Sequence, residues 1–334
     1  MPLRHRTSIG LLLLAGALAA HGDDGRDCSK DRGERFSKHH VSADKVPNGR
    51  IDYAIALPCG YDAAIAGRGG YPLIVFLHGG GGSADQLQGY TARIDAAVQA
   101  RTLPPAIWST PSAGRSFYMD YRDGTEMWER AIMAAYLPKI TRDFGIDDPR
   151  QIVVAGISMG GMGSLRLAFK HPDRFGAVAA MEPAIEAALR WSDVATIDKF
   201  YRADQYTVKF GNPGVDTAYW EANHPTTIAA ANPRSLDQLG IYLEVGDVDV
   251  LRLYRGAEFL HRVLFDLDVA HEYRLVRGAD HIGDAHRARR FDDVLDFIGR
   301  HFDPVEEDAA TQALIEQLDS SFDGGRGLPL PSHR

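Results

Sequence analysis

The sequence is poor in cysteine: Cys28 and Cys59 are the only two among 334 residues. No histidine adjoins either of them, so neither has a neighbouring base that would activate a thiol as a nucleophile. If the chain reaches an oxidising compartment, the two can form a disulfide; otherwise they remain free thiols. The sequence leaves both states open.

The sequence also lacks an excess of positive charge. Lys and Arg number 37 against 45 Asp and Glu, which gives a net charge of −8. Nucleic-acid-binding proteins need a basic face, and attraction to an anionic membrane surface needs clustered Lys and Arg. The composition therefore argues against nucleic acid as a partner and gives no reason to expect a membrane.

The apolar run IGLLLLAGALAA, at residues 9–20, is too short to span a bilayer comfortably. It follows the cationic stretch MPLRHRTS, and Ala17 and Ala19 supply the small residues of an Ala-x-Ala cleavage pattern. We expect residues 1–20 to be a cleavable signal peptide. The protein would then be secreted or periplasmic, with no membrane attachment after processing. The alternative is an N-terminal anchor or a buried helix.

The composition as a whole is that of an ordinary globular protein, with 45% hydrophobic and 25% charged residues. Residues 21–48 are polar and charged, which predicts a linker with little structure. Residues 49–303 predict one large domain. Residues 304–334, acidic and then rich in Gly and Pro, predict a tail with one short helix near 309–318.

Short apolar runs alternate with helical patterns within residues 49–303. LIVFL at 73–77 and QIVVAG at 151–156 are typical of strands buried on both faces. Further strands are predicted at residues 51–57, 106–110, 177–181, 241–245 and 272–276. Helices are predicted at residues 84–100, 125–144, 252–267 and 288–302. The alternation predicts an α/β fold, a mostly parallel central sheet with helices on both faces.

Two features interrupt this rhythm. Pro138 lies inside the helical pattern at 125–144 and predicts a kink or a break there. Residues 182–240 are too long for a simple crossover helix, and long excursions from such sheets often cover the ligand crevice. We therefore expect an insertion at 182–240 near the substrate crevice.

The stretch GISMGG, at residues 156–161, places Ser158 between glycines, after a predicted strand and before a helical pattern at 160–171. A strand–Ser–helix turn is sharp, and a Cβ at Gly156 or Gly160 would collide with neighbouring segments. The start of the helix also directs free N–H groups and a partial positive charge at this site. The pattern predicts that Ser158 is a nucleophile.

A serine hydroxyl needs a base, and in a sheet of this kind the base is expected on a loop after the last strand. His281 lies five residues beyond the predicted strand EYRLV. The alternatives fit less well because they lie within or beside predicted helices and strands: His171, His261, His271 and His286. The stretch HIGDAH offers too few ligands at suitable spacing for a metal site.

Acyl transfer also creates an oxyanion, which needs N–H donors. The run LHGGGGS, at residues 77–83, follows the buried strand 73–77. We expect one donor to be the amide of Gly80 or Gly81 and the other the amide of Met159. A phosphate cradle would usually carry a lysine in the next helix, and SADQLQG has none.

The motifs occur in an order that resembles the esterase D-like branch of α/β hydrolases, over about residues 50–302. This branch includes feruloyl and acetylxylan esterases, S-formylglutathione hydrolases, enterochelin esterases and secreted mycolyltransferases. The segments that carry the resemblance are HGGGGS, SFYMDY at 116–121, GISMGGMGSLRLAFKHPDRFGAVAAM at 156–181, EVGDVDVL at 244–251 and HEYRLVRGADH at 271–281. The resemblance implies an α/β-hydrolase fold and a Ser-Asp-His esterase without a cofactor or metal. It does not fix the substrate.

The acid of this triad is expected in the loop GDVDV. The family pattern Gly-x-x-Asp falls on Gly246 and Asp249. Asp247 has an ordinary explanation as a turn residue. Asp280 adjoins His281, and neighbouring side chains generally point apart. We therefore expect Asp249 to be the acid.

These observations predict a secreted serine carboxylic-ester hydrolase that works through an acyl-enzyme. Its partner would be a small-molecule or polysaccharide-linked ester. One alternative is an acyltransferase of the mycolyltransferase type, which passes the acyl group to an alcohol. A less favoured alternative is a non-catalytic binding protein on the same fold. The sequence does not reveal the oligomeric state.

Overall fold

The structure, a computed structural model, describes residues 27–199, 205–211, 214–306 and 308–324. The predicted signal peptide at 1–20 lies outside these residues. The described chain forms one eight-stranded sheet, with strands in the order β1-β2-β4-β3-β5-β6-β7-β8. The strands are β1 Phe36–Ser42, β2 Arg50–Ala56, β3 Leu73–Leu77, β4 Ile107–Pro111, β5 Ile152–Ile157, β6 Ala177–Met181, β7 Gly240–Gly246 and β8 Glu272–Val276.

The sheet is mostly parallel, as predicted. Antiparallel pairing is confined to one edge, where β1 pairs with β2 and β2 with β4. The remaining neighbours, from β4 to β8, are parallel. The carboxyl ends of β3, β5, β6 and β7 therefore lie along the same side of the sheet, where the residues that follow these strands can meet.

Strand β1 corrects the prediction of an unstructured linker over residues 21–48. Its sequence, FSKHHVS, lacks a clear apolar alternation because β1 is an edge strand with half-buried and exposed positions. It nevertheless pairs with β2 along its whole length, from Phe36 opposite Ala56 to Ser42 opposite Arg50. Upstream of β1, Cys28 forms a disulfide with Cys59, which follows β2. The structured domain thus begins before residue 49.

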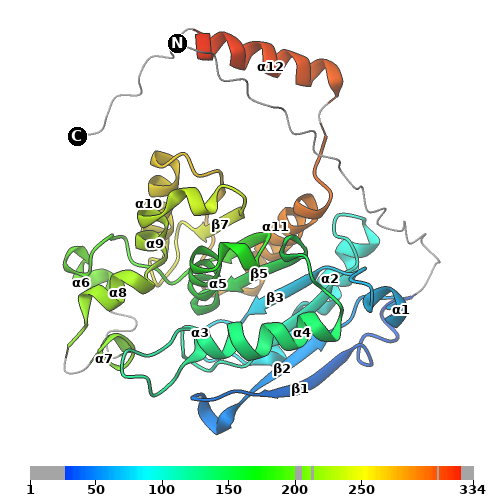
Figure 1. Ribbon diagram of the computed structural model, residues 1–334, viewed down its shortest axis with the longest axis horizontal. Coiled ribbons are helices and arrows are strands. Elements are labelled where there is room, and N and C mark those ends of the chain that lie inside the picture. The colour runs from blue at the N-terminus through cyan, green and yellow to red at the C-terminus, as the bar shows by residue number, and fades with distance from the viewer. Residues whose placement is uncertain (1–26, 200–204, 212–213, 307, 325–334) are drawn as a thin grey trace, which may run out of the picture.

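Helices cover both faces of the sheet (Figure 1). On one face, α2 Thr91–Gln99 and α11 Asp284–Phe302 contribute Ile94 and Phe291 to a buried cluster with Phe76 of β3. On the other face, α5 Met159–Lys170 lies over β5 and β6 and contacts β3. The other main helices are α1 Ala63–Ala66, α3 Trp128–Ala131, α4 Leu137–Asp143 and α10 Tyr254–Asp266. Short 3-10 turns are η1 Pro47–Gly49, η2 Ala84–Tyr90, η4 Pro149–Gln151 and η5 Pro172–Arg174.

The helical pattern at 125–144 changes type before Pro138, where a kink or a break was predicted, but the helix does not end there. Between α3 and α4 the chain forms a π-helical segment, η3 Ile132–Tyr136, in which the Leu137 amide donates to the Ile132 carbonyl, and Pro138 lies in the first turn of α4. Prolines and π-helical segments are both common sites of helix kinks.

The long segment 182–240 folds into short helices, apart from residues 200–204 and 212–213, which lie outside the described part. They are η6 Trp191–Asp193, α6 Thr196–Lys199, α7 Gln205–Phe210, α8 Thr217–Asn223, α9 Pro225–Ala231 and η8 Pro233–Leu236. Helix α12, Ala309–Gly324, stands apart from the sheet and its helices (Figure 1).

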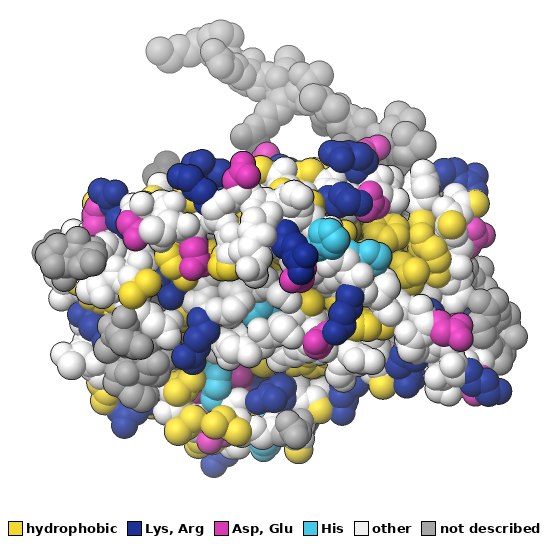
Figure 2. Space-filling model, turned by 90° about the horizontal axis from the view of Figure 1, so that it is seen from below, with side chains coloured by type: hydrophobic (Ala, Val, Ile, Leu, Met, Phe, Trp, Pro, Cys, Tyr) yellow, Lys and Arg dark blue, Asp and Glu magenta, His cyan; other side chains and the backbone are white. Residues whose placement is uncertain are grey.

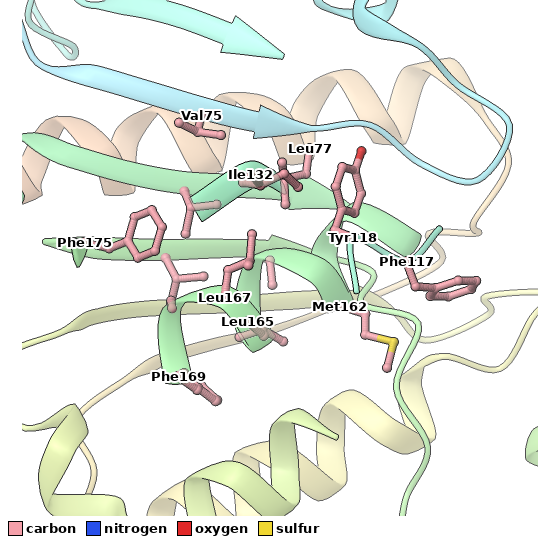
Figure 3. Packing of buried hydrophobic residues seen from close by; sticks show 14 of the residues in the cluster. Val75, Leu77, Phe117, Tyr118, Ile132, Met162, Leu165, Leu167, Phe169 and Phe175 are labelled. Carbon is pink, nitrogen blue, oxygen red and sulfur yellow. The ribbon is translucent and has the colours of Figure 1, made fainter. Parts of the chain in front are cut away.

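Buried packing fixes the backbone at the carboxyl end of β3. Tyr118 stands beside Leu77 in Figure 3, whereas Phe117 points away from it. The Tyr118 hydroxyl donates to the His78 carbonyl at 2.9 Å. A Cβ at Gly163 of α5 would come within 2.6 Å of the Tyr118 ring, so glycine lets α5 approach this close. The segment 117–118 is therefore wedged between β3 and α5.

The surface carries charges of both signs. On the face drawn in Figure 2, Lys and Arg side chains lie among Asp and Glu side chains. None of the helices in the described part of the chain combines the length and apolarity that a membrane span requires.

Candidate functional site

Ser158 lies at the turn from β5 into α5. Its backbone has φ 57° and ψ −114°, a left-handed conformation that costs a serine about 1 kcal/mol or more. A Cβ at Gly156 would collide with the Gly160 carbonyl, and one at Gly160 would collide with the Leu77 carbonyl. The glycines therefore allow β5, the helix start and the end of β3 to approach closely, as the sequence predicted.

The glycine run after β3 is held by His78, which is fully buried. Its Nδ1 contacts the Gly79 carbonyl at 2.7 Å, and its Nε2 accepts from the Ala113 amide at 3.0 Å. Because Nε2 accepts, Nδ1 carries the proton and donates to Gly79. Burial also lowers the pKa of His78, which favours the neutral imidazole. His78 is thus a support for the loop rather than a base.

Three glycines of this run line the cavity in front of Ser158: Gly79, Gly80 and Gly82. The amide of Gly79 donates to Gln86 Oε1 at 3.3 Å, and the amide of Gly82 to the Gly79 carbonyl at 3.0 Å. Gly80 therefore remains the lining glycine whose amide can serve an oxyanion. Gly81, the predicted alternative, has φ 81° and is not among the described residues that line the cavity.

Met159 also lines the cavity and is the first residue of α5. Amides in the first turn of a helix have no intrahelical acceptor. The amides of Met159 and Gly80 are thus the two candidate donors for an oxyanion near Ser158.

His281 hydrogen bonds to Asp249. The Nδ1 atom of His281 lies 3.0 Å from Asp249 Oδ2, and Asp249 Oδ1 accepts from the Leu251 amide at 2.7 Å. At Gly246, where β7 ends, a Cβ would collide with the Ala279 carbonyl, so glycine lets this loop reach the segment before His281. The structure therefore brings Asp249 and His281 together.

The two other aspartates considered in the sequence hold backbone amides. Asp247 Oδ1 accepts from the Gly278 amide at 2.6 Å. Asp280 Oδ1 accepts from the amides of Val250 at 2.7 Å and His281 at 2.6 Å. Both carboxylates thus fix the loops that carry Asp249 and His281.

The other histidines considered in the sequence lie elsewhere in the fold. His261 and His271 contact each other at 2.8 Å, and His171 contacts Glu129 at 3.1 Å. His286 lies in α11.

Sequence reasoning missed a group of buried charges behind His281. Glu182 directly follows β6, and its Oε2 lies 3.3 Å from His281 Nδ1. Arg290 of α11 pairs with Glu182 Oε1, and its Nε lies 3.7 Å from Glu244 Oε2 of β7. Glu182, Glu244 and Arg290 are all fully buried. The only sequence signal for Glu182 is a charged residue at the carboxyl end of the apolar strand AVAAM.

Burial dominates the titration of the two glutamates. It raises the pKa of Glu182 to about 7, although the charges of His281 and Arg290 oppose the rise. It raises the pKa of Glu244 to about 8, again against the charge of Arg290. Burial would lower the pKa of His281, but the Asp249 hydrogen bond and the charge of Glu182 outweigh it, so this pKa is raised above its usual 6.5.

The donor atoms of Glu182, Asp249 and His281 lie within 4.8 Å of one another, a spacing also found among metal ligands. Here His281 Nδ1 is hydrogen bonded to Asp249, and Arg290 supplies a buried positive charge to Glu182. The arrangement is that of a hydrogen-bonded charge network.

Ser158 and His281 line the same cavity, which has a volume of about 340 Å³. Gln205 and Ala184 of the 182–240 segment line it too, so part of that segment does border the crevice. Its other walls are apolar at Phe117, Ile157 and Leu251 and polar at Gln86, Arg115 and Arg287. A serine with a strained backbone, a histidine paired with a carboxylate and two candidate oxyanion donors therefore share one cavity.

The sequence model of the Esterase family matches this chain over residues 45–291. An S-formylglutathione hydrolase of Bos taurus is 30% identical over 142 residues, which cover 41% of this chain and 44% of the relative. The matches thus span less than half the length of the curated relatives.

Solved structures share the fold. A ferulic acid esterase superposes with a TM-score of 0.63 at 20% identity, over 80% of this chain and 98% of the other. An S-formylglutathione hydrolase from Agrobacterium tumefaciens gives a TM-score of 0.62 at 16% identity, over 80% and 95%. The predicted α/β-hydrolase fold and the resemblance to esterase D-like enzymes are confirmed, and the chain belongs to the Esterase family.

Proposed function

We propose that the protein is a serine carboxylic-ester hydrolase with Ser158 as nucleophile, His281 as base and Asp249 as the acid that orients the base. The observation that carries this proposal is the pairing of His281 Nδ1 with Asp249 at 3.0 Å, while His281 and the strained Ser158 line one cavity. The Asp249 contact holds the Nδ1 proton in place, so Nε2 is free to accept the proton of Ser158.

In the proposed reaction Ser158 Oγ attacks the ester carbonyl, and its proton passes to His281 Nε2. The carbonyl oxygen becomes an oxyanion, which the amides of Met159 and Gly80 stabilise. Collapse of the tetrahedral intermediate breaks the ester bond, and His281 returns the proton to the departing alcohol. In the second half of the reaction His281 takes a proton from water, which attacks the carbonyl of the acyl-enzyme. The bond to Ser158 Oγ then breaks, His281 returns the proton to Ser158, and the carboxylic acid product leaves.

The proposed substrate is a small-molecule or polysaccharide-linked ester. The likeness to a ferulic acid esterase supports this substrate class, as does a cavity with both apolar and polar walls. Activity against p-nitrophenyl esters of increasing chain length, and against feruloyl and acetylated-sugar esters, would identify the acyl group.

Replacing Ser158 by alanine tests the nucleophile. Loss of a triad nucleophile lowers kcat by about 10⁶, and labelling by a fluorophosphonate probe should disappear with it. Ser164→Ala is the matched control, because Ser164 lies on the same helix but donates to the Gly161 carbonyl at 2.9 Å. Persistent labelling of Ser158→Ala, with Ser164→Ala unchanged, would refute the assignment.

We also propose that the enzyme is exported. The Cys28–Cys59 disulfide supports this, because disulfides persist in oxidising compartments. N-terminal sequencing of protein from an extracytoplasmic fraction should find a chain that starts near residue 20. A cytoplasmic protein that still begins at Met1 would contradict export.

A further inference from the structure

Two carboxylates face the same nitrogen of His281. Asp249 Oδ2 lies 3.0 Å from Nδ1 and Glu182 Oε2 lies 3.3 Å from it. They arrive from neighbouring parallel strands: Met181 of β6 pairs with Glu244 of β7, so both strands end at the same edge. A triad needs one carboxylate at this nitrogen, and the second requires an explanation.

The backbone of Glu182 has a strained conformation. Its φ is 46°, a left-handed value that is costly for a residue with a Cβ. Its amide still donates to the Glu244 carbonyl at 2.8 Å, so the strand ladder holds this conformation. Ser158, at the end of the adjacent strand β5, also has a positive φ. Strain of this kind persists where the surrounding structure imposes it and clusters at functional sites.

Pairing with Arg290 does not account for the whole of Glu182. Arg290 contacts Oε1, whereas Oε2 is directed to the imidazole. No group in the described part of the chain donates a hydrogen bond to Oε2 within normal geometry, although the side chain is fully buried. Leaving a buried acceptor without a donor is costly, so a small shift of the imidazole toward Glu182 is favoured whenever Asp249 is removed.

We propose that Glu182 is a positioning residue, a reserve acceptor beside Asp249 that takes the hydrogen bond from His281 Nδ1 when Asp249 cannot accept it. The inference rests on the proposed function. The proton stays on Nδ1 throughout, and neither carboxylate takes it. When His281 accepts the Ser158 proton, the imidazolium lies between two carboxylates, and either one can keep the imidazole in the tautomer that leaves Nε2 free.

A double-mutant cycle tests this role. In a triad with one acid, Asp→Asn lowers kcat by about 10⁴. Here we expect Asp249→Asn to cost about 10² and Glu182→Gln less than about tenfold, whereas the double variant should lose about 10⁴. Glu182→Gln would then be at least ten times more damaging in the Asp249→Asn background than in the native enzyme.

Glu244→Gln is the matched control, since Glu244 contacts Arg290 but not His281. It should change kcat by the same factor in both backgrounds. If Glu182→Gln behaves like this control, its role is limited to Arg290 and the proposal is wrong. Should the double variant fold poorly, Glu182→Asp keeps the charge for Arg290 while it shortens the reach to Nδ1, and it should show the same dependence on background.

A tautomer measurement decides the question without turnover. Two-bond ¹H–¹⁵N correlation spectra, recorded above the pKa of the imidazole, should show His281 protonated on Nδ1 in the native protein and in Asp249→Asn. The proton should move to Nε2 only in the double variant. A move in Asp249→Asn alone would overturn the role of Glu182, while turnover by Ser158→Ala would instead overturn the proposed function.

Discussion

Two buried charge clusters of this protein have opposite compositions. Around Glu129 of α3, one carboxylate faces three basic side chains of α5 and its end: Arg166 at 3.7 Å, Lys170 at 2.8 Å and His171 at 3.1 Å. Around Arg290, three carboxylates, those of Glu182, Glu244 and Asp249, share one guanidinium and one imidazole.

The titration of the glutamates follows from these compositions. Burial alone would raise the pKa of Glu129, but the His171 hydrogen bond and the charges of Arg166 and Lys170 lower it to about 2. In the Arg290 cluster burial raises the pKa values of Glu182 and Glu244 to about 7 and about 8, because the nearby positive charge is too small to offset it. The pKa values of these buried glutamates thus differ by several pH units.

From this difference we expect the Glu129 cluster to stabilise the fold and the Arg290 cluster to act on His281. The Glu129 cluster joins α3 to α5, and Arg166 also donates to the Phe117 carbonyl at 2.8 Å beside the cavity. The Arg290 cluster has more carboxyl groups than its cations can balance. Ionising all of them is costly for the fold, which is why two of their pKa values are raised, but each carboxylate that is ionised near His281 favours a positive charge on the imidazole.

The largest effect on stability is expected for Glu129→Gln. A folded pKa of about 2 against a usual 4.5 contributes roughly 3 kcal/mol of stability above pH 4.5, which is lost as the pH falls through about 2. The variant should therefore lose about 3 kcal/mol at neutral pH, and the loss should shrink steadily in acid. Urea unfolding across this range measures it.

Glu306→Gln controls for net charge, because Glu306 is exposed. It should leave the free energy of unfolding nearly unchanged. A Glu129→Gln protein as stable as this control at neutral pH would show that the Glu129 cluster adds nothing to the fold.

The Glu244→Gln substitution should change the free energy of unfolding in the opposite direction, as a gain in stability. A folded pKa of about 8 means that the fold holds a proton that the unfolded chain releases above pH 4.5, so stability falls as pH rises from 4.5 to 8. Glutamine cannot ionise and escapes this loss. We expect Glu244→Gln to gain about 1–2 kcal/mol at neutral pH, after the weakened contact with Arg290 is deducted.

The gain at Glu244 should grow between pH 4.5 and 8 and be absent in acid. The same urea titrations measure it. A loss as large as that of Glu129→Gln would show that Arg290 balances its carboxylates fully.

The sequence predicts the Arg290 cluster much less well than it predicts the fold. LIVFL and AVAAM are recognisable as strands because both faces are buried, so no polar residue interrupts them. FSKHHVS was missed for the opposite reason, since an edge strand can be polar on both faces. Ser158 and His281 could be proposed from their places after strands, because the carboxyl ends of parallel strands meet at one edge. The choice of Asp249 over Asp247 in the loop GDVDV came from the family pattern Gly-x-x-Asp.

Glu182 and Arg290 could not be assigned in the same way. Glu182 also follows a strand, but its contact with His281 depends on the order β6-β7-β8 and on a left-handed φ, neither of which a local pattern contains. Arg290 lies in the charged stretch ARRFDD and resembles a solvated helix residue until the packing of α11 buries it.

The smallest expected effect is on the pH dependence of turnover, and it tests the Arg290 cluster at the site itself. His281 must be neutral to accept the Ser158 proton, so kcat/KM falls as the pH drops through its folded pKa. That pKa is raised: burial lowers it, but Asp249 and Glu182 raise it by more, and Arg290 opposes them. The acid limb of the native profile should therefore lie above about pH 6.5.

Glu182→Gln removes one of the charges that raise this pKa, so the acid limb should move to lower pH, by less than about one unit. Glu182 itself titrates near 7, so the limb reports the coupled set of Glu182 and His281 rather than either residue alone. Glu244→Gln, which removes a carboxylate that contacts Arg290 and not His281, should move the limb less. If the acid limb of Glu182→Gln stays in place or moves to higher pH, the charge of Glu182 interacts with Arg290 and does not raise the pKa of the imidazole.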